Sequence, residues 1–244
     1  MSEPARSLSL TEALDRVMSR DRVLVGIDFD GTLAPIVDHP DDAVPDQRAI
    51  ELLKGLATRP DLDVAVVSGR ALDDLRLRLG DVPGATLIGE HGNDIGESSS
   101  EDPLIAEAAA MIDEIADRLG AIVERKQRSV TFHYRNLPEE VTERSLRRIR
   151  DWAQRHGRVR VLEGKQVIEL STATRNKGHA IRDLAGPAGV IYIGDDTTDE
   201  TVFETLGPDD VGVKVGEGQS AATHRVEDID GVVTILQQIA LASR

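Results

Sequence analysis

The sequence predicts an α/β protein: a parallel sheet with helices on both faces, interrupted by a smaller inserted α/β unit. Short β-branched, apolar runs alternate with segments of helical spacing over residues 23–92 and again from residue 176. Each run ends abruptly in polar residues, as buried parallel strands do. Between these two stretches the rhythm changes, which indicates a second unit.

Composition limits the class of protein. The 244 residues suffice for one large or two small domains, and no stretch approaches the ~20 apolar residues of a membrane span. A net charge of −15 argues against nucleic acids and anionic membranes as partners. The absence of cysteine excludes disulfides, a thiol nucleophile and thiolate metal sites. The N-terminus lacks the layout of a secretory signal, so we expect a cytoplasmic protein, and we expect it to be a monomer.

The first part of the main domain is predicted to be strand–helix cycles. The run VLVGID (23–28) is a buried strand that stops at a carboxylate, and Ile50, Leu53 and Leu56 mark one face of the next helix. The elements expected in order are a strand at 23–28, a helix at 46–56, a strand at 64–67, a helix at 72–79, a strand at 85–88 and a polar loop at 89–92.

A Gly/Ser-rich stretch at residues 96–100 has the composition of a linker and predicts a domain boundary. The order α-β-β-α-β-β after it predicts a small antiparallel sheet backed by two helices. We therefore expect a core domain of residues 1–96 and 172–244 and an inserted cap of residues 97–171. The expected cap elements are a helix at 104–119, strands at 121–125 and 130–134, a helix at 141–156, and strands at 158–162 and 166–170 joined around Glu163-Gly164-Lys165.

The first rhythm resumes at Asn176. Here a helix precedes the strand VIYI, and the polar segment 194–200 follows that strand. The expected elements are a helix at 176–184, strands at 190–193 and 211–215, and helices at 201–206 and 232–242.

Polar residues that follow the predicted strands form a chemically consistent set. Ligands of doubly wound sheets bind beyond the carboxyl ends of the strands. The first strand leads into DFDGT (28–32), the second into SGR (68–70) and a later one into GDDTTDE (194–200), while Lys177 begins a helix. Such crowded carboxylates need a cation, and oxygen ligands favour Mg²⁺.

This set predicts phosphoryl chemistry. Asp28 would attack phosphorus while Lys177 and the metal screen the negative charge, and Asp30 would protonate the leaving alcohol and then activate water. A calcium loop starting at Asp28 is excluded, because Leu33 and His39 stand where glycine and glutamate are required.

Asp28 to Thr32, Ser68, Lys177 and Gly194-Asp195-Asp196 match in order the four motifs of the haloacid dehalogenase superfamily. The longer segments resemble the trehalose-6-phosphate phosphatase family within it: DFDGTLAPI, VVSGR, GEHG, HYR, GKQVIEL and GDDTTDE. The resemblance implies a Rossmann-like hydrolase core, a cap inserted after the third core strand, Mg²⁺, and hydrolysis of trehalose 6-phosphate to trehalose and phosphate.

The resemblance also implies roles for individual residues. Asp28 would be the nucleophile and Asp30 the general acid and base, both also binding metal, with Asp195 as a second carboxylate ligand and Asp196 and Asp199 binding it less directly. Thr32, Ser68 and Lys177 would hold the phosphate. The residues expected to line the cleft near the sugar are Arg70, Glu90, His91 and Gly92; those expected to contact the sugar from the cap are Glu124, Lys126, His133, Arg135, Lys165 and Glu169.

Two alternatives stay open. One is another phosphosugar phosphatase of the same build, acting on mannosyl- or glucosyl-phosphoglycerate or on sucrose phosphate. The other is a non-catalytic sensor of a sugar phosphate, although a pure binder needs no nucleophile.

Overall fold

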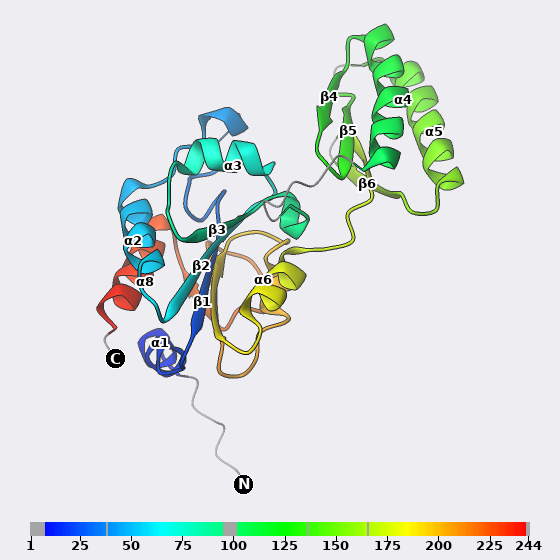
Figure 1. Cartoon of the computed structure of the whole chain (residues 1–244). Coiled ribbons are helices and arrows are strands. Elements are labelled where there is room, and N and C mark those ends of the chain that lie inside the picture. The colour runs from blue at the N-terminus through cyan, green and yellow to red at the C-terminus, as the bar shows by residue number, and fades with distance from the viewer. Residues whose placement is uncertain (1–7, 38, 95–101, 136, 165, 243–244) are drawn as a thin grey trace. The chain divides into compact units, whose positions relative to one another are not determined.

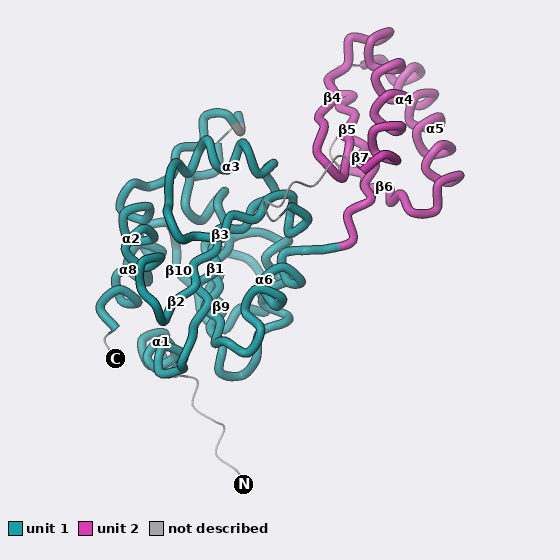
Figure 2. The backbone as a smooth tube through the Cα atoms, viewed as in Figure 1, with its two compact units in different colours: residues 1–96, 175–244 teal, residues 97–174 magenta. Residues whose placement is uncertain are grey.

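A computed structural model describes residues 8–37, 39–94, 102–135, 137–164 and 166–242. The chain forms two compact units, which Figure 2 distinguishes by colour. We call residues 1–96 and 175–244 the core unit and residues 97–174 the cap unit.

A six-stranded parallel sheet forms the centre of the core unit, in the order β10-β9-β8-β1-β2-β3 (Figure 1). The predicted parallel α/β class is confirmed. In the register, Asp28 pairs with Val67 on one side of β1, and Ile27 pairs with Ile193 on the other. The residues that follow β1, β2 and β8 therefore lie at one edge of the sheet. The strands are β1 (Val23–Asp28), β2 (Leu62–Val67), β3 (Ala85–Ile88), β8 (Gly189–Gly194), β9 (Val211–Val215) and β10 (His224–Val226).

Helices cover both faces of this sheet. Alternate strand residues point to opposite faces, so Val25 and Ile27 pack in one apolar cluster with α1, α2 and α8, while Leu24 and Tyr192 pack in another with α6 and α7. Burial on both faces explains why the strands read as continuous apolar runs. The helices are α1 (Leu10–Met18), α2 (Gln47–Ala57), α3 (Leu72–Leu79), α6 (Lys177–Ala185), α7 (Glu200–Phe203) and α8 (Ile229–Leu241), with 3-10 turns η1 (Pro40–Asp42) and η2 (Glu90–Gly92).

The cap unit is a four-stranded antiparallel sheet in the order β4-β5-β7-β6. Its two helices pack on one sheet face, where Ile112 and Ile149 join Phe132 and Ile168 in a single buried cluster. We call the opposite face, which carries Thr131, the open face. The elements are α4 (Pro103–Leu119), β4 (Ile122–Arg125), β5 (Ser129–His133), α5 (Glu139–Arg155), β6 (Arg160–Gly164) and β7 (Val167–Ser171).

Some predicted boundaries were wrong. Glu163 and Gly164, expected in a turn, lie in β6, because the reversal comes later, at Gln166 with a φ of 62°. The helix expected at 201–206 already ends at Phe203. Strand β10 was missed, since three residues are too few for a periodic signal. No helix of the described residues is long and apolar enough to cross a membrane.

Candidate active site

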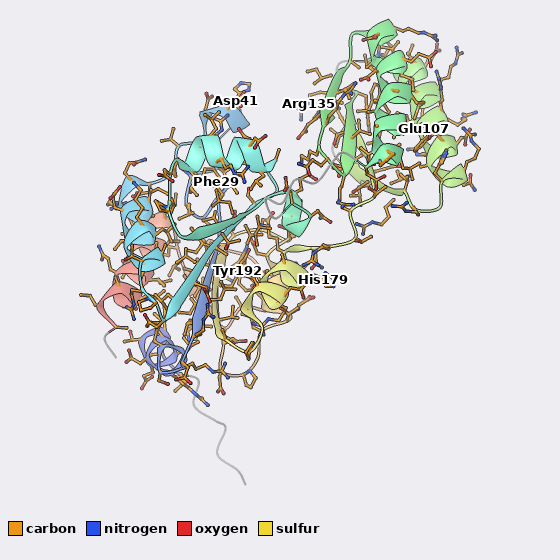
Figure 3. The ribbon with its side chains drawn as sticks, viewed as in Figure 1. Phe29, Asp41, Glu107, Arg135, His179 and Tyr192 are labelled. Carbon is orange, nitrogen blue, oxygen red and sulfur yellow. The ribbon has the colours of Figure 1, made fainter. Side chains whose placement is uncertain are left out.

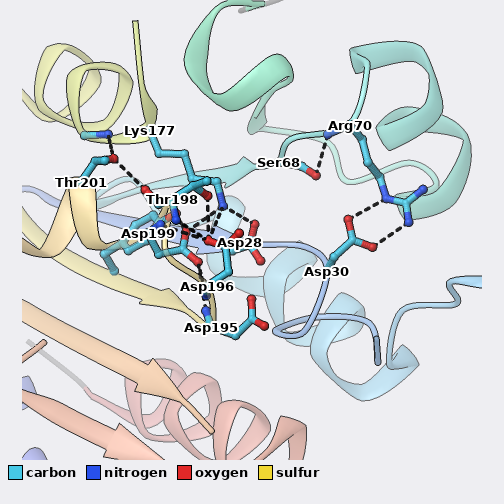
Figure 4. A network of polar contacts seen from close by, with 12 residues as sticks. Asp28, Asp30, Ser68, Arg70, Lys177, Asp195, Asp196, Thr198, Asp199 and Thr201 are labelled. Carbon is cyan, nitrogen blue, oxygen red and sulfur yellow. Dashed lines mark hydrogen bonds and ion pairs between the residues drawn. The ribbon is translucent and has the colours of Figure 1, made fainter. Parts of the chain in front are cut away.

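Asp28 is the last residue of the central strand β1, and its side chain is buried at the carboxyl edge of the sheet. Its Oδ1 accepts a hydrogen bond of 2.7 Å from Lys177 Nζ (Figure 4). Burial raises the pKa of Asp28 well above its ordinary value, and the charge of Asp199 adds to this, while Lys177 opposes it. Asp28 is thus a carboxylate that depends on nearby positive charge to remain ionised.

Lys177 supplies part of that charge. It is the first residue of α6, directly after Asn176, whose side chain caps the helix by accepting from the His179 N–H. Its ammonium is buried and also donates to Asp199 Oδ1 at 2.8 Å. Burial alone would lower the pKa of Lys177, but Asp28 and Asp199 outweigh it and raise the pKa, so the side chain stays charged.

Asp199 organises the segment that follows β8. Its Oδ1 accepts from Lys177 and from the hydroxyl of Tyr192, at 2.7 Å for the latter, and its Oδ2 accepts from the backbone N–H groups of Asp195 and Asp196, at 3.0 Å each. A Cβ at Gly194 would overlap this carboxylate, so the glycine at the strand end permits the close approach. Asp199 therefore fixes the lysine and the backbone of residues 195–196 together.

Asp195 is poorly satisfied by the side chains and backbone around it. Its Oδ1 is buried and lacks a hydrogen-bond partner among the described residues. Burial, then Asp196 and Asp199, raise its pKa to about 6, while the buried Lys214 on β9 opposes the shift. A Cβ at Gly31, whose φ is 82°, would overlap Asp195 Oδ2, which explains the glycine in the first motif.

Asp196 instead caps its own turn. Its Oδ1 accepts from the N–H and hydroxyl of Thr198 and from the N–H of Asp199. Burial would raise the pKa of Asp196, but Lys177 and the Thr198 hydrogen bonds hold it below 3.8.

These side chains fit a divalent cation. Oxygen atoms of Asp28, Asp195 and Asp199 lie within 4.8 Å of one another. Together with Asp196 they set four carboxylates against Lys177 and Lys214, an excess of about two negative charges that Mg²⁺ would offset. Asp28 and Asp195, whose Oδ1 has no hydrogen-bond partner among the described residues, are better placed as ligands than Asp199, because the Asp199 carboxylate already accepts four hydrogen bonds.

Asp30 faces a different partner. Both of its carboxylate oxygens accept from Arg70, at 2.8 Å from Nε and 2.6 Å from the terminal nitrogen (Figure 4). The same guanidinium donates to Asp74 on α3 and lies over the Phe29 ring. Arg70, which we expected to line the cleft near the sugar, thus holds the expected general acid in a bidentate ion pair.

The expected phosphate-binding hydroxyls lie at the same sheet edge. Thr32 and Ser68 are completely buried. Thr32 Oγ1 has no hydrogen-bond partner among the described residues, and Ser68 Oγ accepts from the Arg70 N–H at 3.2 Å. An unsatisfied buried hydroxyl is costly, so an anion at this edge would supply the missing acceptor.

The loop GEHG after β3 is strained. Glu90 and His91 have φ angles of 48° and 55°, in the left-handed region, and Gly92 follows with 102°. Such backbone persists only where the surrounding structure holds it, and it gathers at functional sites. Glu90 and Gly92 are buried and His91 is half-buried.

In the cap unit, three expected sugar contacts lie close together on the open face. Glu124 Oε1 lies 3.4 Å from Lys126 Nζ, and its Oε2 lies 3.5 Å from His133 Nε2. Glu124 and Glu169 flank Thr131 across three neighbouring strands, and the Thr131 hydroxyl lies 3.4 Å from Glu169 Oε2.

The structure says less about the two other cap residues that were expected to bind the sugar. Arg135 is exposed just after β5, and Lys165 lies outside the described residues. Thr131, Tyr192 and Lys214 were not predicted from the sequence. Tyr192 and Lys214 each place a polar side chain inside an otherwise apolar strand, which was the signal that could have found them.

A family model described as trehalose-phosphatase matches residues 26–230. The chain belongs to the trehalose-phosphatase family. It is 36% identical over 234 residues to the trehalose-phosphate phosphatase of Mycobacterium ulcerans. The alignment covers 84% of this chain and 58% of that protein. It is also 36% identical over 233 residues to the bifunctional trehalose-6-phosphate synthase/phosphatase of Thermoproteus tenax, covering 89% of this chain and 32% of that protein.

A solved structure of Aspergillus fumigatus trehalose-6-phosphate phosphatase aligns with a TM-score of 0.73 and 28% identity, over 97% of this chain and 99% of that one. The resemblance predicted from the motifs is confirmed, as is the core-and-cap fold class. The chain spans about three fifths of the Mycobacterium ulcerans protein and about a third of the Thermoproteus tenax protein, so parts of both relatives lie outside the matched stretch.

Proposed function

We propose that the protein hydrolyses trehalose 6-phosphate to trehalose and phosphate through a phosphorylated Asp28. The observation that carries this is the buried pair of Asp28 and Lys177 at the carboxyl end of the central strand, in a chain of the trehalose-phosphatase family. Buried charge of this kind is expensive, and a site that only bound a sugar phosphate would not need it.

In the first step an oxygen of Asp28 forms a bond to phosphorus, and the bond from phosphorus to the sugar oxygen breaks. Asp30, which must carry a proton at this stage and therefore give up one of its two hydrogen bonds from Arg70, donates that proton to the leaving oxygen. In the second step Asp30 takes a proton from water, which attacks phosphorus and releases Asp28. Arg70 orients the carboxylate form of Asp30, the form that takes the proton in the second step, through two hydrogen bonds.

Lys177 offsets the negative charge that Asp28 and the phosphate bring together, and Thr32 and Ser68 offer hydroxyls to the phosphate oxygens. Mg²⁺, held by Asp28 and Asp195 with Asp199 fixing their surroundings, would supply a further positive charge at the phosphate oxygens. We propose the open face of the cap unit as the element that recognises the sugar.

The partner we propose is a small phosphorylated sugar. Acidic side chains are concentrated in the core unit, 30 against 16 basic ones, whereas the cap unit has 14 against 13. The site must therefore attract an anion against an acidic background, which favours a small substrate that can be enclosed by Lys177 and the metal over a nucleic acid.

Phosphate release from a panel of sugar phosphates, with and without Mg²⁺, tests this function. We expect trehalose 6-phosphate to have the highest kcat/KM and to require Mg²⁺. Preference for sucrose phosphate or a glycosyl-phosphoglycerate would replace the substrate but keep the chemistry. Tight binding of trehalose 6-phosphate without phosphate release would indicate a sensor and contradict the proposal.

A further inference from the structure

Tyr192 is a completely buried tyrosine on β8, inside the core unit (Figure 3). Its hydroxyl donates to Asp199 Oδ1 at 2.7 Å. Its ring packs edge-on against the ring of Phe203, with 5.7 Å between the ring centroids. Tyr192 carries the polar side-chain group of the segment VIYI. An apolar residue at this buried position would pack equally well.

The neighbouring strand makes room for this ring. Gly26 pairs with Tyr192 in the register of β1 and β8, and a Cβ at Gly26 would lie 2.8 Å from Tyr192 Cδ2 and 2.7 Å from Ile181 Cδ1. Glycine inside a buried strand costs stability and often marks a close approach. The glycine therefore lowers the stability of the central strand at the point where the tyrosine ring packs.

The hydroxyl is the first member of a chain of buried hydrogen bonds. Tyr192 donates to Asp199, Lys177 donates to the same Asp199 oxygen at 2.8 Å, and Lys177 donates to Asp28 at 2.7 Å. Burial, followed by the charge of Asp199, raises the pKa of Tyr192, which keeps the hydroxyl protonated as a donor.

Two donors share the Asp199 Oδ1. If the hydroxyl were removed, Lys177 would be the one donor left to this oxygen among the described residues, and the oxygen would draw the ammonium away from Asp28. Because Asp199 Oδ2 also accepts from the N–H groups of Asp195 and Asp196, a shift of the carboxylate would move the backbone of a metal ligand as well.

We propose that Tyr192 is a positioning residue of the phosphatase site, and that it acts through Asp199 on Lys177 and on the backbone of residues 195–196. It does not touch the substrate, since its side chain lies within the core beneath the sheet edge. The inference rests on the proposed function for the role of Asp28 as nucleophile.

The test is Tyr192→Phe, which removes the hydroxyl and keeps the ring. With p-nitrophenyl phosphate and saturating Mg²⁺ we expect kcat to fall about tenfold, the usual effect of losing one hydrogen bond to a charged group, with KM within about twofold of wild type. The matched control is Phe203→Leu, which disturbs the packing of the same ring but removes no hydrogen bond. It should lower thermal stability at least as much and leave kcat unchanged.

Mg²⁺ binding to the substrate-free protein, measured by calorimetry, gives a readout that does not depend on turnover. We expect Tyr192→Phe to weaken it about tenfold, the lower end of the range found for residues that orient metal ligands. In the Asp199→Asn background the same substitution should have little further effect, because both changes act on one hydrogen bond.

A wild-type kcat in folded Tyr192→Phe would overturn the proposal, and so would equal losses in Tyr192→Phe and Phe203→Leu. Additive effects of Tyr192→Phe and Asp199→Asn on Mg²⁺ affinity would show that the tyrosine acts by another route. If wild type hydrolyses p-nitrophenyl phosphate but not trehalose 6-phosphate, the proposed substrate fails while the role of Tyr192 is still decided by these measurements.

Discussion

The two units organise their polar residues in opposite ways. In the core unit, Asp28, Lys177 and Asp199 are buried and joined by hydrogen bonds of 2.7–2.8 Å. On the open face of the cap unit, Glu124 is half exposed and its contacts with Lys126 and His133 are 3.4–3.5 Å long.

This difference in burial and bonding suits two different tasks, chemistry and ligand recognition. Buried charges that are joined by hydrogen bonds are fixed before a ligand arrives, which suits electrostatic stabilisation of a reaction. Exposed side chains that contact each other loosely can exchange those contacts for the hydroxyl groups of a ligand at little cost. This difference supports our proposal that the core unit carries out the chemistry and that the cap unit recognises the sugar.

The largest expected effect is on the chemistry of the core unit. Asp28→Asn should lower kcat by at least about a thousandfold on every substrate, because it removes the attacking oxygen. The control is Asp73→Asn, the same chemical change in an exposed side chain that pairs with Arg76, which should be neutral. Steady-state kinetics on p-nitrophenyl phosphate measures both; near wild-type turnover by Asp28→Asn would exclude the covalent mechanism.

Removing the metal should act on the core unit as well. Excess chelator should abolish activity, and Asp195→Asn should raise the Mg²⁺ concentration for half-maximal rate at least about tenfold, because Asp195 Oδ1 has no partner among the described residues. Glu169→Ala should leave this Mg²⁺ requirement unchanged. Activity that persists in chelator would contradict both the metal site and this separation of roles.

A substitution in the cap unit tests whether this unit recognises the sugar without taking part in the chemistry. Glu169→Ala should lower kcat/KM for trehalose 6-phosphate about ten- to a hundredfold, the effect of one charge-assisted hydrogen bond, and barely affect p-nitrophenyl phosphate. Glu163→Ala is the matched control, because Glu163 pairs with Arg150 of α5 rather than lying on the open face. Equal losses on both substrates would mean that Glu169 supports the fold or the core site.

The smallest effect concerns stability of the cap unit alone. Asp102 caps α4 by accepting from the Leu104 N–H, so Asp102→Ala should lower the unfolding free energy by about 1 kcal/mol. Trp152, the single tryptophan, is buried in the cap unit, and its fluorescence during urea unfolding reports this change. Hydrolysis of p-nitrophenyl phosphate should not change.

The same substitution has a pH signature. Burial would raise the pKa of Asp102, but the Leu104 N–H and the charges of Arg158 and Arg128 outweigh it and hold the pKa below 3.8. A depressed native pKa stabilises the fold above the unfolded value, and that stabilisation is lost as the pH falls through the native one. The difference between wild type and Asp102→Ala should therefore be full at neutral pH and shrink below about pH 4; a constant difference would show that the carboxylate charge contributes nothing.

The sequence by itself determined the fold class and the positions of Asp28, Ser68, Lys177 and Asp195. These depend on local patterns: an apolar run defines a buried strand, and in a parallel sheet the residue after each run lies at the same edge. Residue order along one strand also placed Glu124 on a definite face, since side chains alternate. The roles given to these residues remain predictions.

The hydrogen-bond partners of the polar side chains were decided only by the tertiary structure. Arg70 was expected to line the cleft near the sugar, and the structure adds that its guanidinium holds Asp30. Asp199 accepts a hydrogen bond from Tyr192 and also from the backbone of the turn before it. Thr131 lies between Glu124 and Glu169 because three strands pair in one register. Strand register, helix docking and burial depend on the packing of the whole chain, and no local period of the sequence encodes which polar atom a buried donor will meet.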